Sequence, residues 1–456
     1  MNILRSLIYI LQRESYDASR FLSFVYRDWR FWQYEKRQSI DWTLKARLLY
    51  IVLCLLLLLI FTVGFYFLSW RAFYLLLVIL PVLPLLSLLS LVLLSPFDYL
   101  LKYRMISRAQ HFLADNKIVV IGITGSYGKT SLKETLAIVL SSGFKIVKTP
   151  NNINTDLGIA AFILSHRQEL AAADFFIVEM GAYKIGEIAK TCSLVKPQYS
   201  FLSGINEAHL ERFGSLENTI HAKFELGERT AKKVILNFDD INIRNNYVSF
   251  KLPSFVGVDH TLASDVKILP DFGGLSFHYD GELFSTPWLA EHNITLIIMA
   301  LVLAKELGLD LKKAITPLAT APFFKNRLEP IHNYASQLMI IDDSYNGNWS
   351  GFVSGLSVLG RATGRKLVIT PGLVELGAEK ESRHRALARL YAEKDLDLVI
   401  LISNSATAYI IDEFQKISFI KYKVYPDSLS AHRDLASVLR AGDTIIFQND
   451  WPDNYK

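Results

Sequence analysis

The sequence predicts an α/β protein that carries a two-helix transmembrane hairpin near its start. Residues 48–95 are almost entirely apolar, with 39 of 48 positions hydrophobic. From residue 117 onward, short β-rich runs alternate with helical patterns, and a second alternation of this kind begins at residue 337. Such alternation indicates βαβ units with a largely parallel sheet, so we expect two α/β domains after the hairpin.

The apolar segment is too long for a single membrane crossing. A continuous helix over it would extend about 72 Å, whereas the hydrocarbon core of a bilayer is about 30 Å thick. We therefore expect a transmembrane hairpin at 48–96, with spans at 48–69 and 72–95 and a corner at 69–71. Prolines in the second span are expected to kink it. The alternative is a buried hairpin of a large soluble domain, which the near-absence of charge disfavours.

Positive charge lies on both sides of this hairpin. Residues 1–117 carry a net charge of +7, while the remaining 339 residues sum to −2. The positive-inside rule then places both termini and the folded domains in the cytosol, at the cytoplasmic membrane. A nucleic-acid partner is disfavoured, because the folded part has no excess of basic residues.

Residues 1–47 form a basic, aromatic-rich segment before the hairpin. Leu4, Leu7, Ile8 and Leu11 follow helical spacing, which fits an interfacial amphipathic segment. A short helix packed on the cytosolic domain is an equally open alternative. Residues 97–116 are expected to be a linker. The two cysteines and ten histidines show no disulfide framework and no zinc-site spacing.

The periodicity also gives element boundaries in both domains. For the domain at 117–322 we expect strands at 118–123, 175–178 and 199–202, helices at 131–140, 185–190, 216–228 and 294–307, and an antiparallel insertion at 255–289. For the domain at 323–456 we expect strands at 338–341, 367–369, 398–402 and 444–447, with helices near 350–359, 383–392 and 431–440. Pro322, Asn326 and Pro330 mark a hinge between the domains.

A phosphate-binding loop is the sharpest motif. Residues 122–130 read Gly-Ile-Thr-Gly-Ser-Tyr-Gly-Lys-Thr, and they follow an apolar strand and open a helix. Small residues let backbone N–H groups curl round phosphate oxygens, Lys129 reaches the β/γ phosphates, and the Thr130 hydroxyl can ligate Mg²⁺. A strict Walker A spacing would require Gly at position 123, where this chain has Ile. The expected nucleotide-binding residues are Gly125, Ser126, Gly128, Lys129, Thr130 and Ser131.

This loop variant resembles the nucleotide loop of the Mur ligases, the ATP-dependent amino-acid-adding enzymes of cell-wall peptide synthesis. Further segments resemble, in the same order, the MurF type, which adds D-alanyl-D-alanine: TPNNINTDLG at 149–158, VEMGA at 178–182, EAHLERFGS at 207–215, EHN at 291–293, DDSYNGN at 342–348 and VELG at 374–377. The resemblance implies a Mur-ligase-like central P-loop ATPase domain and a C-terminal Rossmann-like domain, both behind the transmembrane hairpin.

The resemblance also implies roles for individual residues. Catalytic residues would be Lys129, Lys223, His209, Glu179 and Arg327, and Mg²⁺ would lie near Thr130, Glu179, His209 and a carbamylated Lys223. Asn293, Asp343 and Asn346 would contact the nucleotide or the incoming amine, while Asn152, Asn154 and Thr155 would face the acyl substrate. Taken alone, a single His or a helical Lys is more often structural, so these assignments depend on the matched blocks.

The resemblance fails at several places. Family members ordinarily begin with a soluble domain that grips the uridine nucleotide of the acyl substrate, and the hairpin occupies its place here. Trp349 stands where the family usually has Pro, and the tail at 442–450 lacks the usual Lys-Gly-Ser-Arg. We therefore expect the acyl acceptor to be lipid-linked or held by a partner protein.

The function expected is an ADP-forming carboxylate–amine ligase, anchored in the membrane and MurF-like, that uses ATP and Mg²⁺. It would join an amino-acid or dipeptide amine donor to a nucleotide- or lipid-linked peptide carboxylate, through an acyl phosphate, in cell-wall precursor synthesis. The alternatives are a non-catalytic ATP-binding membrane scaffold for cell-wall enzymes, and the same chemistry on a folylpolyglutamate or cyanophycin-type substrate.

Overall fold

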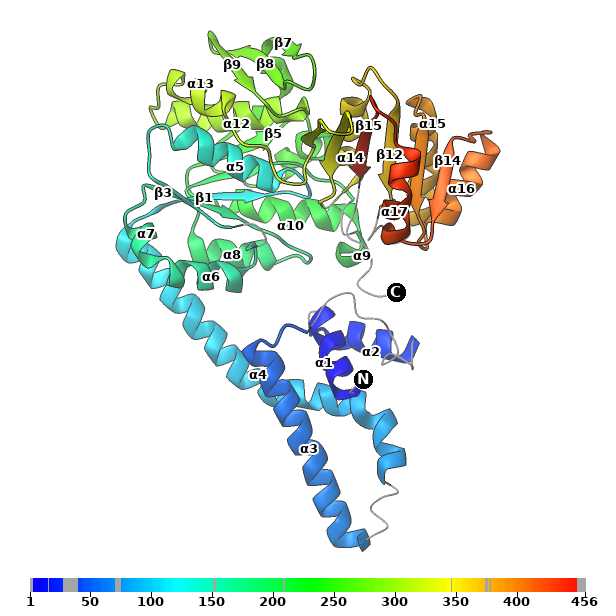
Figure 1. Cartoon of the computed structure of the whole chain (residues 1–456). Helices are drawn as coiled ribbons and strands as arrows, with labels where there is room; N and C mark the ends of the chain where they lie inside the picture. Colours follow the sequence, from blue (N-terminus) through cyan, green and yellow to red (C-terminus); the bar gives the residue numbers. More distant parts are fainter. Residues whose placement is uncertain are drawn as a thin grey trace. The chain divides into compact units, whose positions relative to one another are not determined.

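The computed structural model describes residues 3–14, 16–27, 40–69, 75–150, 153–207, 210–345, 347–373, 376 and 379–448. The chain divides into two compact units, the first ending at Met105 and the second beginning at Ile106. Figure 1 shows the elements of both units with their labels.

The first unit is helical. It contains α1 (Ile3–Arg13), α2 (Ala18–Arg27), α3 (Leu44–Leu68) and most of α4 (Leu75–Asn116). The apolar residues of α1 are buried in a cluster with Phe21 and Phe24 of α2, Ala46 and Leu49 of α3 and Leu83 of α4. The helical spacing predicted at the start of the chain is therefore present, and its apolar side packs on the hairpin helices.

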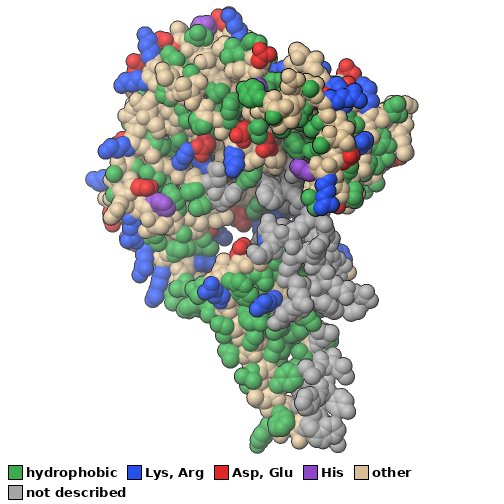
Figure 2. Space-filling model, viewed as in Figure 1, with side chains coloured by type: hydrophobic (Ala, Val, Ile, Leu, Met, Phe, Trp, Pro, Cys, Tyr) green, Lys and Arg blue, Asp and Glu red, His purple; other side chains and the backbone are tan. Residues whose placement is uncertain are grey.

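Two helices, at Leu44–Phe67 and Pro81–Asn116, are long and apolar enough to cross a membrane. Large apolar side chains are exposed along α3, including Leu55, Leu58 and Phe65, and Figure 2 shows this green surface with few charges. Helix α3 ends near the expected corner, where Ser69 has a positive φ of 53°. Trp70 and Arg71, the rest of that corner, lie outside the described residues.

Helix α4 is longer than expected. It contains Pro81, Pro84 and Pro96, and Figure 1 shows that its first half is bent. The helix then continues to Asn116, through the residues expected to be a linker at 97–116. At Pro96 the missing N–H frees the carbonyl of Val92, and the Ser95 hydroxyl donates to that oxygen at 2.7 Å. This local replacement explains why the helix does not end there.

The second unit begins with a six-stranded parallel sheet in the order β2-β3-β1-β4-β5-β6. Its strands are β1 (Val119–Thr124), β2 (Ile146–Lys148), β3 (Phe175–Glu179), β4 (Tyr199–Leu202), β5 (Lys233–Asn237) and β6 (Phe255–Val258). The helices of this part are α5 (Lys129–Leu140), α6 (Asp156–Ser165), α7 (Arg167–Ala171), α8 (Glu187–Val195), α9 (Leu210–Phe213), α10 (Leu216–Glu228), α11 (Ile241–Asn246), α12 (His292–Glu306) and α13 (Lys312–Ala319).

Both faces of this sheet are covered, as its apolar strands require. One core joins strand residues such as Ile121 to Leu132 of α5 and Ile297 of α12, and a second core contains Phe224 of α10. The antiparallel insertion is smaller than predicted. It contains β7 (Ser264–Ile268), β8 (Leu275–Tyr279) and β9 (Glu282–Thr286), whereas β6 pairs parallel to β5. The strand β6 had been expected in the insertion because the sequence pattern does not specify a strand's partner.

A second six-stranded sheet has the order β10-β11-β15-β12-β13-β14. Only its edge strand β10 (Glu329–Asn333) is antiparallel to its neighbour; the others are β11 (Leu338–Asp343), β12 (Lys366–Thr370), β13 (Leu398–Ile402), β14 (Tyr422–Tyr425) and β15 (Thr444–Gln448). The helices α14 (Trp349–Leu359), α15 (Lys380–Glu393), α16 (Thr407–Lys416) and α17 (Ser428–Val438) complete this Rossmann-like part. The α/β class predicted for both parts is confirmed.

Candidate active site

The loop between β1 and α5 has the backbone that a phosphate site requires. Gly128 precedes α5 with a φ of 75°, and Gly125 has a φ of 156°. A Cβ on Gly125 would lie 2.2 Å from the Ser203 hydroxyl oxygen, so a side chain cannot be accommodated there without rearrangement. The loop is held from β4 by Ser126, whose backbone N–H donates to the carbonyl of Gly204 at 2.7 Å. The loop leads through Gly128 directly into the N-terminus of α5, where an anion is stabilised.

Lys129 lies over this loop. Its Nζ donates to the carbonyl of Gly125 at 2.7 Å and lies 3.5 Å from that of Ser126. Burial lowers the pKa of Lys129, with a contribution from Arg327, while Glu179 opposes the shift. The adjacent Ser131 is buried, at the first turn of α5. A lysine at this position can move its ammonium from the loop carbonyls to a phosphate.

Glu179, at the end of β3, faces the start of α5. Its Oε2 accepts from the Thr130 hydroxyl at 3.0 Å, and its side chain is almost fully buried. Burial opposes ionisation, but Lys129, Lys133 and Thr130 together hold the pKa of Glu179 below its ordinary value. Parallel strands β1 and β3 are neighbours, which brings these two predicted residues together.

Lys133 is a residue of this site that the motif comparison missed. It is fully buried, and its Nζ lies 3.3 Å from Oε2 of Glu179. Lys133 follows Lys129 by four positions, so both side chains lie on the same side of α5. That spacing was the available signal in the sequence.

Lys223, on α10, is buried and weakly basic. Burial, and to a lesser extent Lys129, lowers its pKa to about 7, while Glu187 and Glu225 oppose the shift. Its Nζ lies 5.4 Å from the centre of the Phe213 ring. A lysine with such a pKa has a large neutral fraction at cellular pH, and a neutral amine is the nucleophilic form.

Arg327 reaches the loop from the segment between α13 and β10. Its guanidinium donates to the Thr130 hydroxyl at 3.5 Å and lies 4.8 Å from the centre of the Tyr345 ring. Burial raises the pKa of the neighbouring Asp343 to about 7, although Arg327 opposes this shift. Arg327 and the neighbouring Asp343 come from the C-terminal part of the unit, and Arg327 contacts Thr130.

Asn154, one of the expected acyl-substrate residues, lies beside the strand end of Glu179. The carbonyl of Asn154 accepts from the Gly181 backbone N–H at 2.8 Å, and a Cβ on Gly181 would lie 2.9 Å from Cγ of Asn154. The Thr155 hydroxyl accepts from the Gly158 backbone N–H at 3.3 Å, so it caps α6. Asn293 is buried at the start of α12. His209, Asn346 and Asn152 lie outside the described residues.

Two further contacts join the part of this unit that contains the first sheet to the part that contains the second. The guanidinium of Arg383, on α15, pairs with Glu207 and lies 5.5 Å from the centre of the Trp349 ring. Asn206 donates to the Asn348 side chain at 3.4 Å. Trp349 is a position where the sequence departs from the family pattern, and it lies against Arg383 here.

The side-chain oxygens beside the loop are of the kind that binds Mg²⁺. Among the described residues, no group of three His, Cys, Asp or Glu side chains forms a metal cluster. The Thr130 hydroxyl and the Glu179 carboxylate supply two oxygen donors beside the loop, and Mg²⁺ is usually held by one or two protein ligands together with substrate phosphates.

Known proteins are similar to this chain in sequence and in fold. A family model described as the Mur ligase middle domain matches residues 123–304. Residues 123–304 are similar to the Mur ligase middle domain. That match begins in β1 and ends in α12, so it includes the loop, Glu179 and Lys223. The resemblance stated from the sequence is confirmed.

Curated relatives are named UDP-N-acetylmuramoyl-tripeptide--D-alanyl-D-alanine ligase. The protein from Buchnera aphidicola of Acyrthosiphon pisum is 29% identical over 302 residues, and that from Escherichia coli is 30% identical over 302 residues. These alignments cover 64% and 63% of this chain, and 66% and 65% of those proteins, slightly less than two thirds of their length.

Solved MurF structures have the same Mur ligase fold. A structure of MurF from Acinetobacter baumannii matches with a TM-score of 0.67 at 25% identity, covering 76% of this chain and 77% of that chain. MurF from Thermotoga maritima, solved in complex with ADP, matches with a TM-score of 0.66 at 23% identity, covering 76% and 80%.

Proposed function

We propose that this chain is a membrane-anchored, ADP-forming ligase that joins a D-alanyl-D-alanine-like amine to a peptide carboxylate in cell-wall precursor synthesis. The observation that carries the proposal is the joint position of Lys129, Thr130 and Glu179 round a glycine loop that opens α5. The names of the relatives support the choice of substrates. The domain boundaries inferred from the sequence, with a hairpin before two Mur ligase domains, are part of this proposal.

The first step is transfer of the γ-phosphate of ATP to the substrate carboxylate. A carboxylate oxygen forms the new bond to phosphorus, the bond to the β-phosphate oxygen breaks, and ADP leaves. Two anions must approach for this, so the Lys129 ammonium and the Arg327 guanidinium neutralise the transferring group. Mg²⁺ would supply further charge neutralisation when bound near Thr130 and Glu179.

The second step is attack of the donor amine on the acyl phosphate. The amide bond forms, and inorganic phosphate leaves with one oxygen that came from the carboxylate. Asp343 and Asn293 would contact the nucleotide or the amine. The contact between Arg383 and Glu207 holds the two sheets of the unit together, which would exclude water from the reactive intermediate.

Lys223 is proposed to act after carbamylation. Its neutral amine attacks CO₂, loses a proton and becomes a carboxylate. This change replaces a positive charge, which would repel Mg²⁺, by a negative one that supports it. His209 is proposed to hold the same metal region, as the family resemblance implies.

The hairpin is proposed to hold the enzyme at the cytosolic face of the membrane. Its apolar surface and the basic residues on both sides support this placement. There the acyl substrate would be lipid-linked or presented by a partner protein.

Incubation of the purified full chain with ATP, a peptide carboxylate and candidate amines tests this function. We expect D-alanyl-D-alanine to give ADP and a peptide lengthened by one dipeptide, as measured by mass spectrometry. Glutamate and arginine, the donors of folylpolyglutamate and cyanophycin-type ligation, should give no product. Product formation only with those donors would overturn the substrate assignment, and no turnover with any donor would favour the scaffold.

A further inference from the structure

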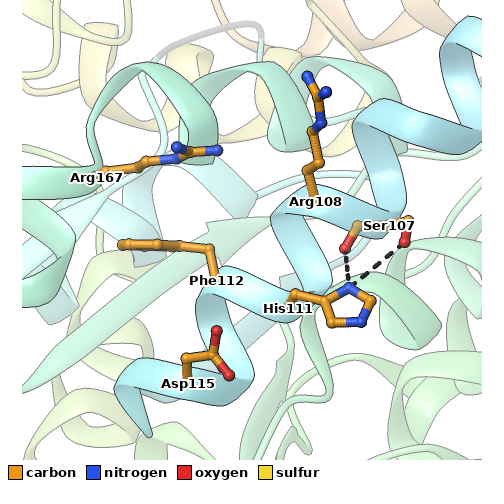
Figure 3. A pocket seen from close by; sticks show the side chains of 6 residues that line it. All are labelled: Ser107, Arg108, His111, Phe112, Asp115 and Arg167. Atoms are coloured by element: carbon orange, nitrogen blue, oxygen red, sulfur yellow. Dashed lines mark hydrogen bonds between the residues drawn. The ribbon is translucent and has the colours of Figure 1, made fainter.

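A pocket lies on the second unit, apart from the residues assigned to ligation. It has a volume of about 430 Å³ and is lined by Ser107, Arg108, His111, Phe112 and Asp115 of α4 and by Arg167 of α7. Figure 3 shows Arg108 and Arg167 on the same side of this space, with Phe112 beneath Arg167 and Asp115 farther along α4. None of these residues belongs to the Mur ligase motifs.

Topology places this pocket at the opposite end of the sheet from the nucleotide loop. Helix α4 ends at Asn116, and β1 begins at Val119, so the pocket lies before the amino end of β1. Arg167 lies in the connection that leads to the amino end of β3. The loop at 125–128 follows the carboxyl end of β1, and a six-residue strand extends about 20 Å. The pocket is therefore a separate site.

The pocket contains two guanidinium groups, those of Arg108 and Arg167. Within the described part of the chain, no acidic side chain lies at ion-pair distance from Arg108 or Arg167. Arg167 is oriented by Phe112, with its guanidinium 5.8 Å from the centre of that ring. The wall itself is fixed, because Gln110 donates to the carbonyl of Ser193 on α8 at 3.0 Å. The pocket thus presents positive charge on a supported surface.

The other lining residues restrict the chemistry of a ligand. Nδ1 of His111 is engaged with the Ser107 carbonyl at 2.6 Å, so that nitrogen is not available to a ligand. Asp115 would repel a bare anion but can accept a hydrogen bond from a hydroxyl group. Phe112 adds an apolar wall. These groups together match a phosphate ester that also carries a hydroxyl, because guanidinium groups bind phosphate oxygens in a forked geometry.

We propose that the pocket between α4 and α7 binds a phosphate ester bearing a hydroxyl group, either as the headgroup of an anionic lipid or as a soluble compound. Arg108 and Arg167 bind the phosphate, and Asp115 accepts from the hydroxyl. This site is independent of the proposed ligase reaction, and its occupant need not be a substrate.

Arginine labelling tests the proposal on the full chain in phosphatidylcholine nanodiscs. Phenylglyoxal modification of Arg108 and Arg167 is followed by peptide mass spectrometry, with Arg104, an exposed residue of α4 outside the pocket, as the internal control. One arm adds glycerol 3-phosphate, and the other incorporates phosphatidylglycerol, which carries the same headgroup chemistry. At concentrations well above Kd, labelling of both pocket arginines should fall by about threefold or more, with Arg104 unchanged.

The two arms identify the source. Protection by glycerol 3-phosphate shows that soluble phosphate esters bind, and protection by phosphatidylglycerol alone shows that a lipid headgroup binds. If neither glycerol 3-phosphate nor phosphatidylglycerol lowered the labelling of Arg108 and Arg167 relative to that of Arg104, the proposal would be overturned.

Substitutions in the pocket provide a further test. One of them is expected to strengthen binding, a result that a folding defect would not produce. Asp115→Asn removes the negative charge of the pocket, so inorganic phosphate should bind several-fold more tightly, as seen in the concentration that protects Arg108 and Arg167. In Arg108→Gln, inorganic phosphate should no longer protect Arg167 from labelling, while ADP formation stays at the wild-type rate. Unchanged phosphate affinity in Asp115→Asn would contradict the assigned site, whatever the outcome for ligation.

Discussion

Burial destabilises the charged form of Lys223 and lowers its pKa from the ordinary value of 10.5 to about 7. The unfolded chain binds a proton at this amine between these two pH values, and the folded chain does not. The penalty is therefore complete below about pH 7 and is relieved as the pH rises toward 10.5. In CO₂-free buffer at pH 7, Lys223→Met should raise the free energy of unfolding by about 2–4 kcal/mol. In buffer that contains bicarbonate, the same substitution should abolish ligation.

Thermal unfolding at several pH values measures this effect. The gain should shrink as the pH rises from about 7 toward 10.5, because the folded wild-type chain holds a neutral amine in this range and removing the proton that the unfolded chain carries costs less as the pH approaches 10.5. Lys190→Met, an exposed change on α8, serves as the control and should alter stability little. A Lys223→Met variant that is less stable at pH 7 would contradict the penalty, and one that retains ligation would contradict the role of the amine.

For the buried pair of Lys133 and Glu179, we predict that removing the lysine destabilises the folded chain. Lys133→Met leaves the Glu179 carboxylate with less compensation, so urea unfolding at pH 7 should show a loss of about 3 kcal/mol. Because the pKa of Glu179 is held below its ordinary value of 4.5, this contribution is present above pH 4.5 and is lost as the pH falls through the folded-state pKa.

A matched lysine provides the control for that change. Lys148 pairs with Glu134 at a more exposed position, so Lys148→Met should cost less than about 1 kcal/mol. Equal losses in the two variants at pH 7 would show that burial of the Lys133–Glu179 pair is unimportant.

At the scale of elements, the sequence predicted those parts whose signals are local. The strand before the loop, the helix after it and the strand ending at Glu179 were all found, because apolar runs and glycines mark them. The contact of Arg327 with Thr130 links residues 197 positions apart, and no periodicity carries that information. The length of α4 was missed because the replacement bond at Pro96 depends on a side-chain rotamer.

Helix α15 contributes a contact that the sequence did not single out. Arg383 pairs with Glu207 across the two sheets, and the pair is partly exposed. A double-mutant cycle of Arg383→Ala and Glu207→Gln should give a coupling energy of about 1 kcal/mol and a fall in kcat of about fivefold, with ATP affinity unchanged. Arg385→Ala, on the same helix but paired with Asp412, is the control and should leave kcat unaltered.

The interpretation of this cycle depends on whether kcat or ATP affinity changes. A change in ATP affinity without a change in kcat would mean that Arg383 affects the nucleotide site and not the closure of the two sheets. Additive effects of the two substitutions would show that the pair is not coupled.

For the whole molecule, membrane anchoring predicts that the chain resists extraction. After carbonate treatment at alkaline pH the full chain should remain in the membrane pellet. Leu58→Arg places a charge on the exposed surface of α3, which costs about 3 kcal/mol at a span centre and should increase the extracted fraction. Leu262→Arg, at an exposed apolar position of the second unit, should not. Complete extraction of the unaltered chain would contradict the anchor.

The central claim, ligation through an acyl phosphate at the loop of Lys129, is tested most directly by oxygen tracing. The full chain is given ATP, the amine donor and a peptide whose carboxylate carries ¹⁸O, and the released phosphate is analysed by mass spectrometry. We predict one ¹⁸O atom per phosphate, and no phosphate release from Lys129→Ala. Phosphate without ¹⁸O, or equal release with and without the peptide, would contradict this mechanism.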